Sequence, residues 1–97
     1  LIKDAISMGI SPDVIDENGT PLLVAAAAID QEETVSFLVD VGANVNATDI
    51  DGETALHASA SLSNPRIVLK LLNAGAEANA RSIDGKTPLM AASIMDR

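Results

Sequence analysis

Apolar residues recur along this chain in short groups, and each group is followed within a few residues by a glycine. The groups are Ile2, Ala5 and Ile6 before Gly9, then Val35, Leu38 and Val39 before Gly42, then Val68, Leu71 and Leu72 before Gly75. Steps of three and four residues place such side chains on one face of a helix. Glycine supplies the left-handed residue at which many helices end. The pattern therefore predicts short amphipathic helices that each end at a glycine.

The spacing of these groups is constant. Gly9, Gly42 and Gly75 are equally spaced along the chain. A second series of glycines with the same spacing lies in polar segments. The second series consists of Gly19, Gly52 and Gly85. A fixed period of this size is typical of stacked structural repeats, in which each unit buries its apolar face against its neighbours.

Threonines mark the start of one helix in each period. Thr54 is a good N-cap, because its hydroxyl can accept from a backbone N–H of the first turn. Thr20 and Thr87 are expected to do the same. Thr20 follows Gly19 directly, whereas one residue separates Gly52 from Thr54. This difference predicts a one-residue deletion in the first turn, which an extra residue between the helices restores.

A second helix start follows in each period. Asn64 before Pro65 combines an N-cap with a proline at the first helical position, and Asp30 with Glu33 has the spacing of a capping box. Helices are predicted over residues 2–8, 21–29, 32–41, 55–62, 65–74 and from 88 onward. Polar turns are predicted over residues 13–19, 44–53 and 78–86.

Two segments of the chain resemble the signature of the ankyrin repeat, D-x-x-G-x-T-P-L-H-x-A. Residues 49–59 read DIDGETALHAS and residues 82–92 read SIDGKTPLMAA, while the endings GANVN and GAEAN occupy 42–46 and 75–79. The equivalent residues 9–13 depart from this ending, with Asp13 where the later repeats have Asn46 and Asn79. The resemblance covers nearly all of the chain. It implies an all-α solenoid of stacked antiparallel helix pairs with projecting β-turn fingers.

The repeats are expected to form one ankyrin repeat domain over residues 1–97. It divides into a partial repeat over 1–15, repeats over 16–48 and 49–81, and a partial repeat over 82–97. Because the chain begins with Leu1 and ends at Arg97 in mid-pattern, both ends are expected to be cut from a longer protein. Ile94 and Met95, like the apolar residues near the start, are expected to face helices beyond the chain. Repeat arrays normally need polar caps, so end-to-end self-association is a further expectation.

Composition argues against several classes of partner. The chain has a formal net charge of −8 and one aromatic residue, whereas nucleic acids and anionic membranes attract basic surfaces. It has no cysteine, which excludes disulfides and thiolate metal sites and favours the cytoplasm over secretion. It has no apolar run long enough to span a membrane. The expected partner is therefore another protein.

No residue pattern indicates catalysis or a cofactor. His57 is the only histidine, and the resemblance implies that it ties its helix start to neighbouring backbone. A calcium loop around Asp51 would need ligands where Ala47 and Ala58 stand. Ser59 lies near His57 without a nucleophile elbow, and a single histidine without cysteine is a poor metal set. The chain is predicted to be neither an enzyme nor a metal or cofactor protein.

The predicted turns carry most of the features expected of a binding surface. Ile50 and Ile83 are apolar at the tips of turns, where the repeat does not need them buried. The turns are also acidic, which either steers a basic partner or merely solvates the edge. The predicted contacts are Glu17, Asn18, Ile50, Asp51, Glu53, Ile83, Asp84 and Lys86 in the turns, with Ser61 and Leu62 in the groove.

The resemblance implies a protein–protein interaction scaffold, which binds through its turn tips and the groove-facing side of the first helices. A second hypothesis makes the array an accessory part of a larger enzyme or effector chain, where it would position or inhibit the fused activity. The sequence beyond the two ends would distinguish these hypotheses.

Overall fold

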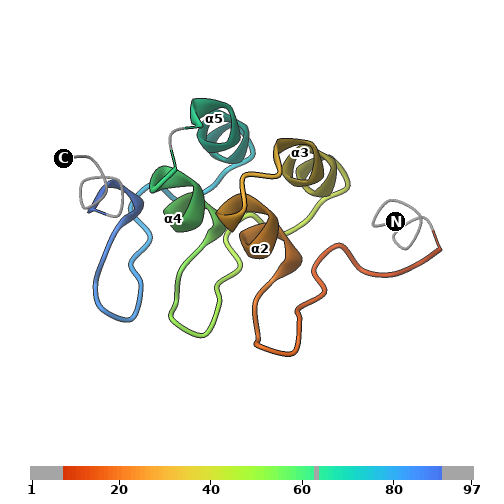
Figure 1. The fold of residues 1–97 in the computed structure, drawn as a ribbon, viewed down its shortest axis with the longest axis horizontal. Helices are drawn as coiled ribbons and strands as arrows, with labels where there is room; N and C mark the ends of the chain where they lie inside the picture. Colours follow the sequence, from red (N-terminus) through yellow and green to blue (C-terminus); the bar gives the residue numbers. More distant parts are fainter. Residues whose placement is uncertain (1–7, 63, 91–97) are drawn as a thin grey trace.

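The computed structural model describes residues 8–62 and 64–90, and its helices form two stacked pairs (Figure 1). Helices α2 (Leu22–Ala28) and α3 (Glu32–Asp40) form the first pair, and α4 (Ala55–Ala60) and α5 (Pro65–Asn73) form the second. The second pair repeats the first, with α4 packed on α2 and α5 on α3. The predicted helices over these residues are confirmed to within two residues at each end. Most of the first predicted helix, and the last one beyond residue 90, lie outside the described residues.

The core is shared by the two pairs, because each helix packs both on its partner in the pair and on the equivalent helix of the other pair. The helices are six to nine residues long, and helices this short are not stable alone in water. Leu38 of α3 and Ile67 and Leu71 of α5 are fully buried in this one cluster, so each pair depends on the other for its stability. None of the helices in residues 8–62 and 64–90 is both long enough and apolar enough to cross a bilayer.

Glycines end both second helices in the same way. Gly42 and Gly75 have φ angles of +94° and +99°, which glycine adopts at little cost. After α5, Ala76 N donates to Leu71 O at 3.0 Å and Gly75 N donates to Leu72 O at 3.1 Å. The same pair of hydrogen bonds follows α3. This Schellman arrangement satisfies the last carbonyls of the helix and turns the chain toward the next finger.

Three hairpin loops project on the side of α2 and α4, away from α3 and α5 (Figure 1). We call residues 13–20 finger 1, residues 46–53 finger 2 and residues 79–86 finger 3. In finger 2, Asp49 Oδ1 accepts from Asp51 N at 2.9 Å and from Glu53 N at 3.0 Å. Asp16 does the same in finger 1, and Ser82 accepts from Lys86 N in finger 3. A short polar side chain at the loop start therefore shapes every finger.

The repeat register continues without interruption through the first finger, so the predicted deletion is wrong. Thr20 O accepts from Asp16 N and Thr20 N donates to Asp16 Oδ1, as Glu53 does with Asp49. Pro21, not Thr20, is the N-cap of α2, and it makes no side-chain cap. Thr20 therefore closes its finger instead of capping a helix, because its equivalent in the next repeat is Glu53 and not Thr54.

The other predicted caps divide in the same way. Thr54 caps α4 and Asn64 caps α5 through their side chains, and Thr87 Oγ1 accepts from Met90 N at 3.3 Å. The predicted capping box of Asp30 and Glu33 is wrong. Asp30 lies outside α3 with a φ of +60°, and Gln31 is the N-cap. The Asp30 carboxylate instead accepts from Asn64 Nδ2 at 2.7 Å, which joins the two helix pairs.

The segment after each helix-ending glycine is linked to the equivalent segment of the next repeat by the side chain at one repeat position. Asn46 Oδ1 accepts from Glu77 N at 2.8 Å, and its Nδ2 donates to Gly75 O at 3.3 Å. Asp13, at the same position one repeat earlier, accepts from Asn44 N through its carboxylate. The aspartate in the first of these segments thus keeps the acceptor half of the link and lacks the donor half.

We expect the Asn46→Ala variant to lose about 1 kcal/mol of unfolding free energy, because it removes two hydrogen bonds between repeats. Asn79→Ala is the matched control, since the Asn79 side chain makes no hydrogen bond to any described residue. Urea unfolding followed by circular dichroism measures both variants. Equal losses would show that Asn46 acts within its own repeat.

Candidate functional site

The most exposed apolar side chains on the fingers lie at adjacent tips. Ile50 is 72% exposed and Ile83 is 74% exposed, and each is followed by an acidic residue and a glycine. A large exposed aliphatic side chain gains free energy when a partner buries it. Glu17 and Asn18 occupy the equivalent two positions in finger 1, so its tip offers no aliphatic residue.

The tips are fixed to one another. Ile83 N donates to Asp51 O at 2.9 Å, which joins fingers 2 and 3. A Cβ built on Gly52 would lie 3.0 Å from Ile83 N, and one built on Gly19 would lie 2.9 Å from Ile50 Cγ2. The fingers therefore approach so closely that the tip positions leave no space for a side chain in place of these glycines.

We expect Gly52→Ala to destabilise the protein more than Gly85→Ala. Both glycines have φ near +75° to +79°, so each alanine costs about 1–2 kcal/mol in backbone strain. Only Gly52 also faces the next finger, since nothing lies within 4 Å of a Cβ on Gly85. The difference between the two variants in thermal unfolding measures finger-to-finger packing. Equal losses would mean that the fingers separate without cost.

The acidic residues of the fingers fall into two groups. Asp13, Asp16 and Asp49 accept backbone hydrogen bonds that link the repeats and shape the turns. The side chains of the other four make no hydrogen bond or ion pair with any described residue. These are Glu17, Asp51, Glu53 and Asp84. All four are among the predicted contacts, and the first, second and fourth lie exposed at the finger tips.

The remaining predicted contacts lie apart from the tips. Lys86 is half-buried at the base of finger 3, where its backbone pairs with Ser82. Ser61 and Leu62 follow α4, at the opposite end of that helix from its finger. Ser61 Oγ donates to Ala58 O at 3.0 Å. Ile29 is the equivalent of Leu62 in the preceding repeat and is strongly exposed. Sequence reasoning placed both residues at the ends of predicted helices and selected only Leu62 as a contact.

Asn18 is not the left-handed residue of its turn. Gly19 has the positive φ of +78°, and Asn18 N donates to Asp16 Oδ1 at 2.8 Å. The Asn18 side chain is exposed and makes no hydrogen bond to a described residue. It is therefore free to contact a partner.

His57 is a structural residue that joins finger 2 to finger 3. Its Nδ1 lies 3.1 Å from Thr54 N, and its Nε2 lies 2.8 Å from Lys86 O. An amide can only donate and a carbonyl can only accept, so Nδ1 accepts and Nε2 carries the proton. His57 is 2% exposed, and both ring nitrogens are bonded within the protein.

We expect His57→Leu to lower the unfolding free energy by about 1–3 kcal/mol, because Thr54 N would stay buried without its acceptor. Met90→Leu at the same repeat position is the control, with an exposed side chain and an expected change below about 0.5 kcal/mol. Chemical denaturation compares the two. A loss for His57→Leu no larger than the control's would remove the structural assignment.

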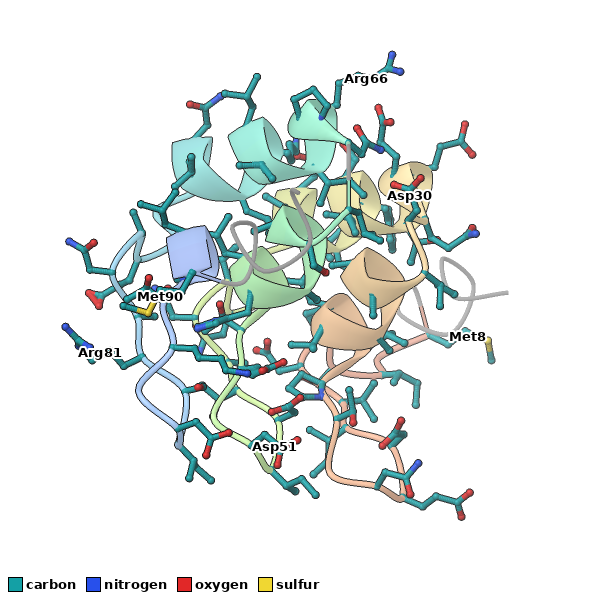
Figure 2. The ribbon with its side chains drawn as sticks, turned by 60° about the vertical axis from the view of Figure 1, so that its left-hand side comes forward. Met8, Asp30, Asp51, Arg66, Arg81 and Met90 are labelled. Carbon is teal, nitrogen blue, oxygen red and sulfur yellow. The ribbon has the colours of Figure 1, made fainter. Side chains whose placement is uncertain are left out.

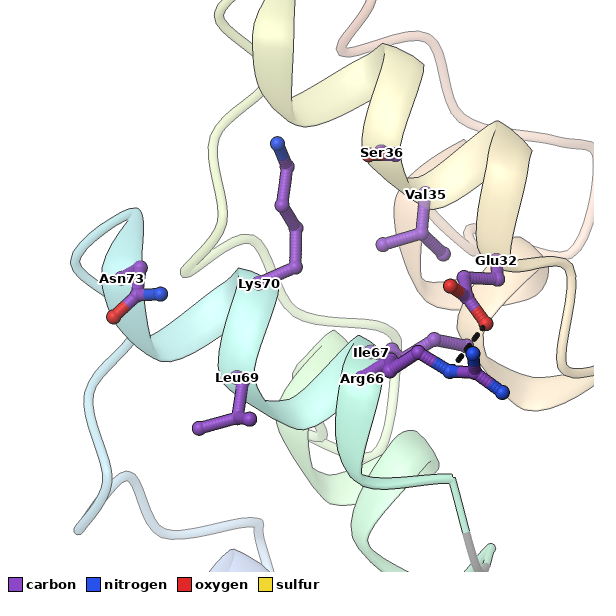
Figure 3. A pocket seen from close by; sticks show the side chains of 8 residues that line it. All are labelled: Glu32, Val35, Ser36, Arg66, Ile67, Leu69, Lys70 and Asn73. Atoms are coloured by element: carbon purple, nitrogen blue, oxygen red, sulfur yellow. Dashed lines mark ion pairs between the residues drawn. The ribbon is translucent and has the colours of Figure 1, made fainter.

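A shallow pocket of about 300 Å³ lies between α3 and α5, on the side away from the fingers (Figure 3). The two basic side chains of the pocket form ion pairs with acidic residues of α3: Arg66 Nε lies 3.5 Å from Glu32 Oε1, and Lys70 Nζ lies 2.8 Å from Asp40 Oδ1. These pairs each join one helix pair to the next. Within residues 8–62 and 64–90, no three His, Cys, Asp or Glu side chains are grouped to hold a metal ion.

The stacked helix pairs and projecting fingers define a repeat solenoid. Residues 1–82 match the family model for ankyrin repeats in three copies, and the chain therefore belongs to the ankyrin repeat family. None of the curated proteins matches the chain. Ankyrin repeats are in general protein–protein interaction modules, and such domains are typically non-catalytic.

Proposed function

We propose that this chain is a rigid scaffold that binds a partner protein through its finger tips and the adjoining groove. The observation that carries this proposal is the pair of exposed isoleucines on neighbouring tips that are fixed to each other. Ile50 packs one methyl group against finger 1, and the backbone of Ile83 is bonded to finger 2. Their side chains remain more than two-thirds exposed. Apolar anchors inside a polar rim concentrate binding energy in protein interfaces.

Rigidity supports the same conclusion. Association costs free energy when loops must be ordered on contact. Here the hydrogen bonds inside each finger, and those between fingers 2 and 3, exist before a partner arrives. The interaction between tips and partner therefore does not have to offset the cost of folding the loops.

The groove contributes a second, smaller contact area. Ser61 and Leu62 lie at the end of α4, and the exposed Ile29 occupies the matching place after α2. A partner that reaches from the tips to these residues would lie across both first helices. The acidic tips favour a partner with a basic surface.

The ends of the stack offer a different apolar surface. Beyond α4 and α5 a concavity of about 300 Å³ is lined by Leu56, Ala60, Val68, Leu72, Ala78, Pro88 and Leu89. A second copy of the chain that packed on this face would bury these side chains. Self-association through this face is therefore a second candidate use of the protein, distinct from binding at the fingers. A role as an accessory module of a larger chain is compatible with both.

We expect alanine substitution at Ile50, Asp51 and Ile83 to weaken binding of a captured partner, with the isoleucines each costing about 1–2 kcal/mol. Isothermal titration calorimetry measures the affinity, and Leu69→Ala is the control, since Leu69 is exposed on α5 away from the fingers. Unchanged affinity in all three variants would exclude the tips as the interface. Light scattering on the same samples separates partner binding from self-association.

A further inference from the structure

Charge is distributed unevenly along the stack. Residues 8–62 contain ten acidic residues and no lysine or arginine, whereas residues 64–90 contain four basic and two acidic residues. The first helix pair and its finger, together with finger 2, are thus uniformly negative, and the net charge changes sign in the second half of the described chain.

On the helix side two of the four carboxylates are paired with bases of the second half. Glu32 pairs with Arg66 and Asp40 pairs with Lys70 across the boundary between α3 and α5. Figure 2 shows Arg66 beside the second helices and Asp51 at the far side, among the fingers. Arg66 and Lys70 thus pair with carboxylates on the helix side and form no ion pair with a described carboxylate of fingers 1 and 2.

On the finger side the charge is unbalanced in fingers 1 and 2 alone. Finger 3 carries Arg81 and Lys86 around its single carboxylate, Asp84. Arg81 Nη1 lies over its own finger, where it donates to Gly85 O at 3.2 Å. Fingers 1 and 2, by contrast, contain Glu17 and Asp51 but no lysine or arginine, although finger 2 also adjoins finger 3. The three tips therefore differ in electrostatic potential although their backbones repeat.

An aliphatic side chain of finger 2 lies against the tip of finger 1. Ile50 Cγ2 approaches the Gly19 backbone at the tip of finger 1, so this side chain bridges the tips that carry Glu17 and Asp51. The rest of Ile50 is open to solvent. Apolar and anionic groups from two fingers thus form one contact area, which we call the acidic tip pair: Glu17, Asn18, Ile50 and Asp51.

We infer that the acidic tip pair receives a basic segment of the partner protein, in which an aliphatic residue is flanked by lysine or arginine. The aliphatic residue packs on Ile50, and the cations lie near Glu17 and Asp51. The part of the segment over finger 3 is not basic, because Arg81 and Lys86 repel cations there. This inference rests on the proposed function and adds the chemistry and the direction of the bound segment.

Lysine and arginine suit this surface for a second reason. Their long aliphatic stems can cover the exposed part of Ile50 while the charged ends reach the carboxylates. Unneutralised charge on one face also speeds the approach of an oppositely charged partner, and salt weakens the effect. The contribution of each exposed pair to affinity is modest, so the effects of single substitutions are small and need matched controls.

The test is a selection of random peptides, about a dozen residues long and displayed on phage, against the immobilised chain. We expect the selected peptides to combine an aliphatic residue with neighbouring lysine or arginine. Fluorescence anisotropy of the synthetic peptides should then show about twofold to fivefold weaker binding for Glu17→Gln and for Asp51→Asn, and the difference should shrink at high salt.

Two variants with the same change in net charge are the controls. Asp84→Asn alters the equivalent position of finger 3, and Glu33→Gln alters an exposed residue of α3 on the helix side. Each should weaken binding by less than about 1.5-fold. A loss at Asp84 equal to that at Asp51 would overturn the direction of binding. An equal loss at Glu33 would reduce the effect to overall charge and overturn the inference.

The outcomes also separate this inference from the proposed function. Peptides that are not basic, yet lose affinity in Ile50→Ala and Ile83→Ala, would overturn the inference and leave the tips as an interface. If no selected peptide depends on the tip residues, or none is selected, both are overturned. Because the chain contains no cysteine, a photo-crosslinker can be attached to a single site in the Asn18→Cys variant. The crosslinker should react with the basic end of the bound peptide.

Discussion

Contact between successive helix pairs is the constraint on which the rest of this structure depends. Helices of six to nine residues do not persist alone, and the buried apolar side chains of all four helices form one core cluster. Polar groups follow the same rule. Asn46, His57 and Asp13 each bond to backbone in the following repeat. Their bonds give the stack one defined spacing, which close packing of apolar groups alone does not specify.

That spacing extends to the surface. Since Gly19 and Gly52 each lie close against the neighbouring finger, the distance between tips is set by the same register that packs the core. Side chains at the tips can vary without disturbing the stack, because those of Glu17, Asp51 and Asp84 take no part in the bonds that shape the fingers. The repeat thus separates residues that fix geometry from residues that are available for contact.

Helix positions could be predicted from the sequence because the apolar groups and their glycines share one period, and the bounds agree to within two residues. The errors arose where a local motif was preferred to that period. Thr20 has the sequence neighbours of a cap, yet the repeat register places it at the close of a finger. Asp30 has capping-box spacing, yet its backbone is left-handed and its carboxylate bonds to Asn64. Hydrogen bonds within the finger decided the first case, and a contact with the next repeat accompanies the second.

The number of acidic residues at the candidate site could be predicted from the sequence, but which of them shape the fingers and which face solvent could not. Asp49 and Asp51 are two residues apart and carry the same charge, yet Asp49 accepts the hydrogen bonds that form the finger and Asp51 faces solvent. Removing Asp49 would disorder the tip and weaken binding without any contact being lost. A loss of binding therefore identifies a contact residue only when the substitution leaves the finger folded. Substitution of Asp51, which follows the tip isoleucine, meets this condition, and substitution of Asp49 at the loop start does not.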